Sequence, residues 1–152
     1  MDFVKHILAV SWLTEHCNKT IRFGISLSLK YKAELSVIHV IDTKWLQGWS
    51  VPMIYMEQEH KKEMEKHKAE LHNIISVEKK KGMIIKEFVR EGTPAEVILK
   101  LIEEEGIDLL ILRSHEENRL ERMLVGGSND EIIRAMPCSI FLVKQETCAE
   151  FK

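Results

Sequence analysis

Short apolar runs recur along the chain without alternating polar positions. Four of them are Ile7 to Val10, Leu35 to Ile41, Leu109 to Leu112 and Ile140 to Val143, and a fifth, Met83 to Val89, is more mixed. Continuous apolar runs of this length are typical of strands that are buried on both faces of a parallel sheet. The pattern therefore predicts five strands covered by helices.

The segments between these runs have helical spacing. From Thr14 to Lys32, apolar residues recur every four positions, which predicts an amphipathic helix. Its expected inward stripe is Cys17, Ile21, Ile25 and Leu29, with Asn18, Lys19, Arg22 and Lys30 facing water. A charge-dense second helix is expected from about Glu57 to Lys81, with Met64, Leu71, Ile74 and Ile75 on one face.

The helix that starts near Thr93 has the clearest start and stop signals. Thr93 can cap it, Pro94 suits the first helical position, and Glu96 completes a capping box. Gly106 can end the helix. We therefore expect a helix over about 94–105.

The last helix has a similar start, because Ser128 and Glu131 repeat the S-x-x-E pattern, and Pro137 closes it. Strands and helices thus alternate along the whole chain. This order predicts a doubly wound α/β fold.

The composition and charge of the chain favour a single globular domain and argue against nucleic-acid-binding and membrane proteins. The 152 residues fit one domain, and 45% hydrophobic with 30% charged residues can build a core. With 22 Lys and Arg against 24 Asp and Glu, the net charge is -2, so we expect no nucleic-acid partner. No run approaches the roughly 20 apolar residues of a membrane span, and the first residues do not resemble a signal peptide. We expect a cytoplasmic protein whose cysteines, Cys17, Cys138 and Cys148, are reduced.

Two further features have competing interpretations. His60, Glu63 and His67 in the long helix could suggest a metal site, but no further ligand converges there, so we expect histidines packed at the edge of the helix stripe and no metal. Trp45 to Met56 is uncharged and contains two tryptophans. It either fills a gap in the core, which we favour, or forms an exposed docking surface for a protein partner.

Ligands of open parallel sheets bind outside the carboxyl ends of the strands. Three loops lie there: Ser11 to Leu13, Asp42 to Lys44 and Arg113 to Ser128. The last loop ends in Gly126-Gly127-Ser128 directly before a helix, and free N–H groups at a helix start can accept an anion. A phosphate site is therefore a hypothesis for this loop.

The segment LLILRSHEENRLERMLVGGSNDEIIRAMPCSIFLV resembles the carboxyl-terminal third of the universal stress protein family. HILAVSW, AELSVIHVID and VREGTPAEVILKLIEEEGIDLLIL extend the resemblance over nearly the whole chain. The resemblance implies an open, Rossmann-like five-stranded parallel sheet of order 3-2-1-4-5 with helices on both faces. ATP-binding members carry G-x-x-G-x9-G-S/T between the fourth strand and the last helix.

When the family's ATP-binding motif is aligned with this sequence, several of its positions carry a different residue. The first two family glycines fall on Arg113 and Glu116, the third falls on Gly126, and the Ser/Thr position falls on Gly127, so that Ser128 comes one place late. The Asp of the first turn, which contacts adenine, falls on Ser11. Val40, whose counterpart offers its backbone to the base, is retained.

These departures predict weak or no ATP binding and no required cofactor. Long side chains in place of glycine hinder close approach of the phosphates, and Glu116 and Glu117 would repel them. We expect a non-catalytic regulatory module of the stress response. The alternative is a protein that binds ATP or another phosphate ligand through Gly126, Gly127 and Ser128, with Arg113 as charge partner.

Two further expectations concern a catalytic pair and the last strand. Ser114 and His115 are adjacent, yet no third orienting carboxylate is identifiable, so we expect no enzyme. The resemblance implies a homodimer through the last strand, Ser139 to Val143, which is apolar and has neither Pro nor inward charge to protect an exposed edge.

Overall fold

A computed structural model describes residues 3–11, 18–42, 53–114 and 128–144. Five strands form one parallel sheet in the order β3-β2-β1-β4-β5. The strands are β1 (His6–Ser11), β2 (Glu34–Asp42), β3 (Ile85–Gly92), β4 (Leu109–Arg113) and β5 (Ser139–Val143). The helices are α1 (Lys19–Tyr31), α2 (Met53–Lys80), α3 (Pro94–Glu105) and α5 (Ser128–Ala135). The predicted doubly wound α/β fold and its strand order are confirmed.

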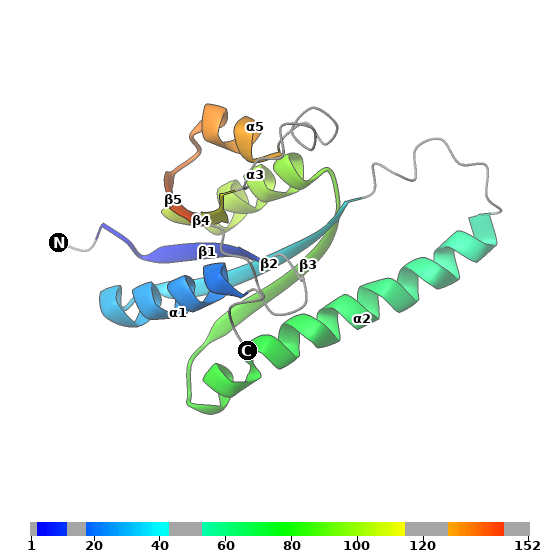
Figure 1. Ribbon diagram of the computed structural model, residues 1–152, viewed down its shortest axis with the longest axis horizontal. Helices are drawn as coiled ribbons and strands as arrows, with labels where there is room; N and C mark the ends of the chain where they lie inside the picture. The colour runs from blue at the N-terminus through cyan, green and yellow to red at the C-terminus, as the bar shows by residue number, and fades with distance from the viewer. Residues whose placement is uncertain (1–2, 12–17, 43–52, 115–127, 145–152) are drawn as a thin grey trace.

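Helices cover both faces of the sheet, with α1 and α2 on one side and α3 and α5 on the other (Figure 1). Side chains of β1 alternate between the two layers, because successive residues of a strand point to opposite faces. Ile7 and Ala9 join the cluster of α1 and α2, while Leu8 and Val10 join the cluster of α3 and α5. Burial on both faces explains why this strand reads as an unbroken apolar run.

The stripe expected for α1 is partly wrong. Ile21 is buried and Ile25 packs half-buried against the core, as predicted, but Leu29 is 64% exposed. Cys17 lies outside the described residues. The other buried positions are Thr20, Gly24 and Ser28. Four residues turn an α-helix through about 400°, so a strict repeat of four drifts away from the core side. The buried hydroxyl groups are satisfied, because Thr20 donates to the Val10 carbonyl at 2.8 Å and Ser28 to the Ala33 carbonyl at 2.5 Å.

The boundaries of α3 match the prediction, with Pro94 first and Gly106 ending the helix in the left-handed conformation. The expected capping box is wrong, because Thr93 occupies the N-cap without a side-chain hydrogen bond. Proline already restricts the backbone at the first helical position, which favours the helix start without that bond.

Two other elements differ from the sequence-based boundaries. The α2 helix begins at Met53, earlier than expected. Among its described side chains, the buried ones, Leu71 and Ile75, lie in the carboxyl-terminal half. The β3 strand begins at Ile85, because pairing with Leu35 of β2 starts there, while Ile84 is 85% exposed. Apolar content alone therefore placed β3 too early.

The predicted segment Trp45 to Met56 lies mostly outside the described residues, and its last four residues open α2. In the described ranges, no helix combines the length and hydropathy of a membrane span.

Candidate functional site

The carboxyl ends of the parallel strands meet at one edge of the sheet, and Ser11 is the last residue of β1 there. Ser11 is 3% exposed, and its buried Oγ has no hydrogen-bond partner among the residues that the structure describes. Buried hydroxyl groups are normally hydrogen-bonded. Ser11 therefore offers an unsatisfied donor and acceptor at the edge where the sequence predicts a ligand.

Arg113 is the last residue of β4, and its main chain is tied to α5. The Asn129 side-chain amide donates to the Arg113 carbonyl oxygen at 2.8 Å, and Asn129 is 7% exposed. The Ser114 amide and hydroxyl groups donate to the Val143 carbonyl at 2.8 and 3.1 Å. These bonds fix the start of the long predicted ligand loop relative to β5 and α5.

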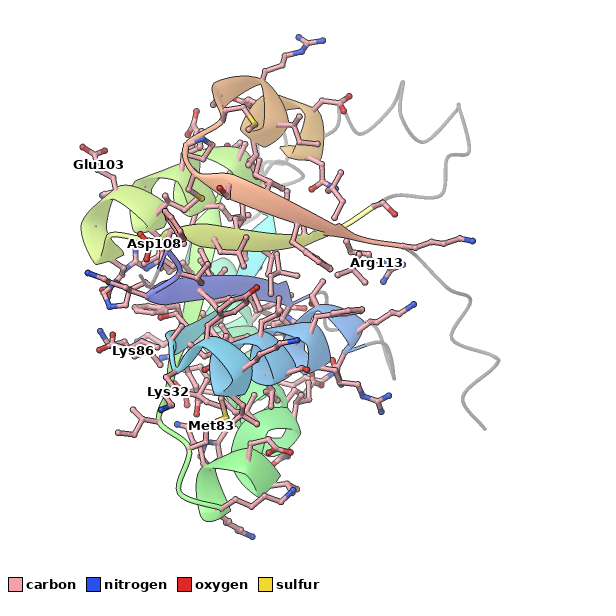
Figure 2. All side chains as sticks on the ribbon, turned by 90° about the vertical axis from the view of Figure 1, so that its left-hand side faces the viewer. Lys32, Met83, Lys86, Glu103, Asp108 and Arg113 are labelled. Atoms are coloured by element: carbon pink, nitrogen blue, oxygen red, sulfur yellow. The ribbon has the colours of Figure 1, made fainter. Side chains whose placement is uncertain are left out.

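The Arg113 side chain is half-buried, and this burial lowers the pKa of its guanidinium from the usual value. Figure 2 shows Arg113 at the opposite end of the sheet from Asp108 and Lys86. A bulky cation thus stands where the predicted phosphate loop leaves the sheet.

The other predicted site residues are only partly brought together. The Val40 side chain packs toward the layer of α3 and α5. Ser11 is in register with His39, the residue before Val40, so its side chain points to the opposite face of the sheet. Only the main chain of Val40 can therefore share a site with the Ser11 side chain. Ser128 opens α5, whose first turn also carries Asp130 and Glu131. Glu116, Gly126 and Gly127 lie outside the described residues.

A histidine pair lies beside Ser11. The sequence predicts that His67 packs at the edge of the helix stripe, but it gives no partner for it on the sheet. The ring of His39 on β2 lies 4.8 Å from the ring of His67 on α2, and His39 Nδ1 lies 3.2 Å from the Ser11 carbonyl oxygen. Burial lowers the pKa of His39; the bond to Ser11 opposes this effect, and the nearby His67 adds to it. The only signal in the sequence was a histidine inside an otherwise apolar strand.

These histidines do not form a metal centre with their neighbours. In the described part of the chain, no group of three or more His, Cys, Asp or Glu side chains could hold a metal ion.

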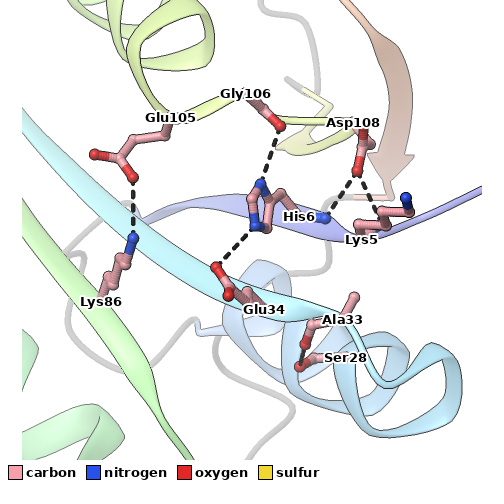
Figure 3. A network of polar contacts seen from close by, with 9 residues as sticks. All are labelled: Lys5, His6, Ser28, Ala33, Glu34, Lys86, Glu105, Gly106 and Asp108. Carbon is pink, nitrogen blue, oxygen red and sulfur yellow. Dashed lines mark hydrogen bonds and ion pairs between the residues drawn. The ribbon is translucent and has the colours of Figure 1, made fainter.

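The opposite, amino-terminal edge of the sheet is filled by contacts within the protein (Figure 3). Asp108 Oδ2 accepts the amides of Lys5 and His6 at 2.8 and 2.9 Å. The His6 ring bridges the Gly106 carbonyl at 3.2 Å and the Glu34 carboxylate at 2.8 Å. The unsatisfied Ser11 hydroxyl therefore distinguishes the carboxyl-terminal edge as the candidate ligand site.

The open parallel sheet with helices on both faces (Figure 1) defines a doubly wound α/β protein. In this class, ligands bind at the carboxyl ends of the strands, where Ser11 and Arg113 lie here. The family model "Universal stress protein family" matches residues 4–144. The chain belongs to the universal stress protein family.

Individual relatives agree with this assignment. A universal stress protein of Methanocaldococcus jannaschii is 30% identical over 91 residues, which cover 60% of this chain and 52% of that protein, about half its length. One of Methanothermobacter thermautotrophicus is 25% identical over 145 residues, covering 90% and 94% of the two chains.

Solved structures show the same fold. The structure of the hypothetical protein MJ0577 has a TM-score of 0.72 at 23% identity and covers 95% of this chain and 99% of its own. A universal stress protein described in complex with cAMP has a TM-score of 0.63 at 14% identity, covering 93% and 97%.

Proposed function

We propose that this protein is a non-catalytic, regulatory binding module of the stress response that binds ATP weakly or not at all. The observation that carries the proposal is Arg113 at the end of β4, where ATP-binding members of the family have the first glycine of their motif. Glycine lets a phosphate approach the main chain, whereas Arg113 adds a long, half-buried side chain at this point.

Ser11, in place of the family's aspartate, also lowers the expected affinity for ATP, because it weakens the contact with the adenine base. The family's aspartate would accept a hydrogen bond from adenine as a charged group, and a serine hydroxyl is a weaker partner. Loss of one such bond in a dry site costs about 1–3 kcal/mol. Each 1.4 kcal/mol corresponds to about tenfold in affinity.

Charge at the start of α5 also disfavours a polyphosphate. Helix N-termini attract anions because of the helix dipole, but the first turn of α5 already carries Asp130 and Glu131. In the sequence, Glu116 and Glu117 add two more carboxylates in the preceding loop. Like charges at about 4 Å repel by roughly 1–4 kcal/mol, depending on screening.

A catalytic role is disfavoured by the geometry of Ser114. Its hydroxyl group donates to the Val143 carbonyl oxygen at 3.1 Å, so the proton that a general base would remove is already engaged by the main chain.

The unsatisfied Ser11 hydroxyl favours a second candidate function, which is binding of an adenine nucleotide or another phosphate ligand. In that case Gly126, Gly127 and the Ser128 amide would hold the phosphate, with Arg113 as the cation. Two solved relatives of the same fold are described with cAMP and, for a protein of Arabidopsis thaliana, with AMP bound.

Calorimetric titration of the full chain with Mg-ATP, AMP and inorganic phosphate separates these functions. We expect no heat of Mg-ATP binding up to millimolar concentration, and a measurable gain in affinity in the double variant Arg113→Gly, Glu116→Gly. Arg134→Ala, which removes an exposed arginine from the last turn of α5, is the matched control. Micromolar affinity of the wild-type protein for Mg-ATP would overturn the main proposal, and binding of AMP or phosphate alone would support the second.

A further inference from the structure

The contact between His39 and His67 joins the sheet to the middle of α2. The two rings lie 4.8 Å apart with an angle of 35° between their planes. His39 Nδ1–H donates to the Ser11 carbonyl oxygen, whereas the buried Nδ1 of His67 has no hydrogen bond within the described part of the chain. In this arrangement the two rings pack against each other, and the His39 ring is anchored to β1.

Among the side chains of α2 that the structure describes before His67, only Met64 is partly buried. The others are exposed, namely Glu59, Lys61, Lys62, Glu63, Glu65 and Lys66. The following part is anchored differently, because Leu71 and Ile75 are fully buried and Lys79 and His72 both contact Glu87 of β3. Figure 1 shows α2 running along the sheet with this later half beside β3.

We propose that the His39–His67 contact is a proton-sensitive clasp, and that protonation of both rings releases the part of α2 before Leu71 from the sheet while the later half stays in place.

The charges around His39 and His67 determine whether the contact between the two rings is stable after one or both are protonated. The Glu70 carboxylate lies 3.7 Å from His67 Nδ1 and offsets one added positive charge. A second charge on His39 then lies against a cation in a partly desolvated site, where like charges repel strongly. Separation of the rings relieves this repulsion and exposes both to water.

The other elements on this face of the sheet do not offset the repulsion between two protonated rings. β1 presents the Ser11 carbonyl oxygen, and α1 turns the uncharged Thr20, Ile21 and Gly24 to this face. On β3, Val89 is in register with His39, and the acidic neighbours on that side are Glu87, which is held by Lys79 and His72, and Glu91.

The direction of the pH effect follows from the same contacts. Burial, with the nearby His67, lowers the pKa of His39, and the Ser11 bond and Glu70 only partly compensate. A depressed histidine pKa means that the contact is stable above the usual value of 6.5 and is lost as the pH falls below it.

Hydrogen exchange of the full chain tests the clasp. We compare pH 7.5 with pH 5.0, correct for intrinsic exchange rates, and follow peptides from 59–70, from 72–80 and from α1. In the wild-type protein, opening of 59–70 rises severalfold at the lower pH, while the other two segments change little. His67→Phe keeps a ring against His39 but cannot take a proton, and should abolish the rise.

His72→Gln is the matched control, because His72 is exposed on the same helix and should leave the acid response of 59–70 intact. If His67→Phe does not fold, His67→Gln gives the same comparison. An unchanged 59–70 segment in the wild-type protein at pH 5.0, or an equal rise in the His67 variant, would overturn the proposal.

Discussion

Lys79 on α2 and Glu87 on β3 form an ion pair that joins the carboxyl-terminal half of the long helix to the edge strand of the sheet. His72 lies 3.0 Å from the same carboxylate. Partial burial alone would raise the pKa of Glu87, but the hydrogen bonds from Lys79 and His72 outweigh it and hold this pKa below the usual 4.5.

We predict that Glu87→Gln lowers the free energy of unfolding by about 1 kcal/mol at pH 7, since solvent still reaches the site and screens the pair. A depressed carboxylate pKa stabilises the fold above the unfolded value of 4.5, so the difference from wild type should shrink as the pH falls below it. Urea unfolding at several pH values measures both effects. Glu63→Gln, at an exposed position of α2, should change neither.

At the amino-terminal edge of the sheet, the Asp108 carboxylate connects the start of β1 to the start of β4. Asp108 accepts the amides of both Lys5 and His6, and the amide of Asp108 donates to the His6 carbonyl oxygen. Asp108→Ala leaves two amides without their acceptor, of which that of His6 is partly buried. We expect a loss of about 2 kcal/mol in urea unfolding, compared with almost none for Glu103→Ala on the exposed side of α3. Equal midpoints for the two variants would refute this role.

Close packing of α1 on the sheet depends on Gly24. A Cβ atom there would lie 3.0 Å from Leu35 Cδ1 and 3.3 Å from Ala9 Cβ. Gly24→Val would force the helix and sheet apart, and overpacking of this kind costs about 1–3 kcal/mol. Ser26→Val, at an exposed position of the same helix, is the control, and thermal unfolding followed by circular dichroism compares the two. A Gly24→Val protein as stable as Ser26→Val would show that α1 shifts without cost.

Local signals and topology together explain what the sequence could predict. The unbroken apolar runs predicted the strands because both faces of β1 are buried, and Pro94 and Gly106 predicted the bounds of α3 because both act on the backbone nearby. Ser11 and Arg113 were expected at one edge because all strands are parallel.

Long-range packing explains what the sequence missed. The His39–His67 contact joins a strand to a helix that follows it along the chain, and no local pattern encodes their distance. Leu29 is exposed although it follows the four-residue spacing, because the side of α1 that faces the sheet carries Thr20, Ile21, Gly24 and Ser28 instead.

The prediction of a homodimer rests on β5, which pairs only with β4 among the described strands. Its side chains Leu142 and Phe141, which point to opposite faces of the sheet, are 50% and 36% exposed. An apolar edge strand without charge or proline is available for pairing with a second copy. We expect a dimer at micromolar concentration in size-exclusion chromatography with light scattering, and a monomer for Leu142→Lys, because a charge would be buried at the interface.

Leu29→Lys is the matched control for this substitution, since Leu29 is 64% exposed on α1 and lies on a different element. It should leave the dimer intact and change the net charge by the same amount. A monomeric wild-type protein, or loss of the dimer in both variants, would rule out pairing through β5.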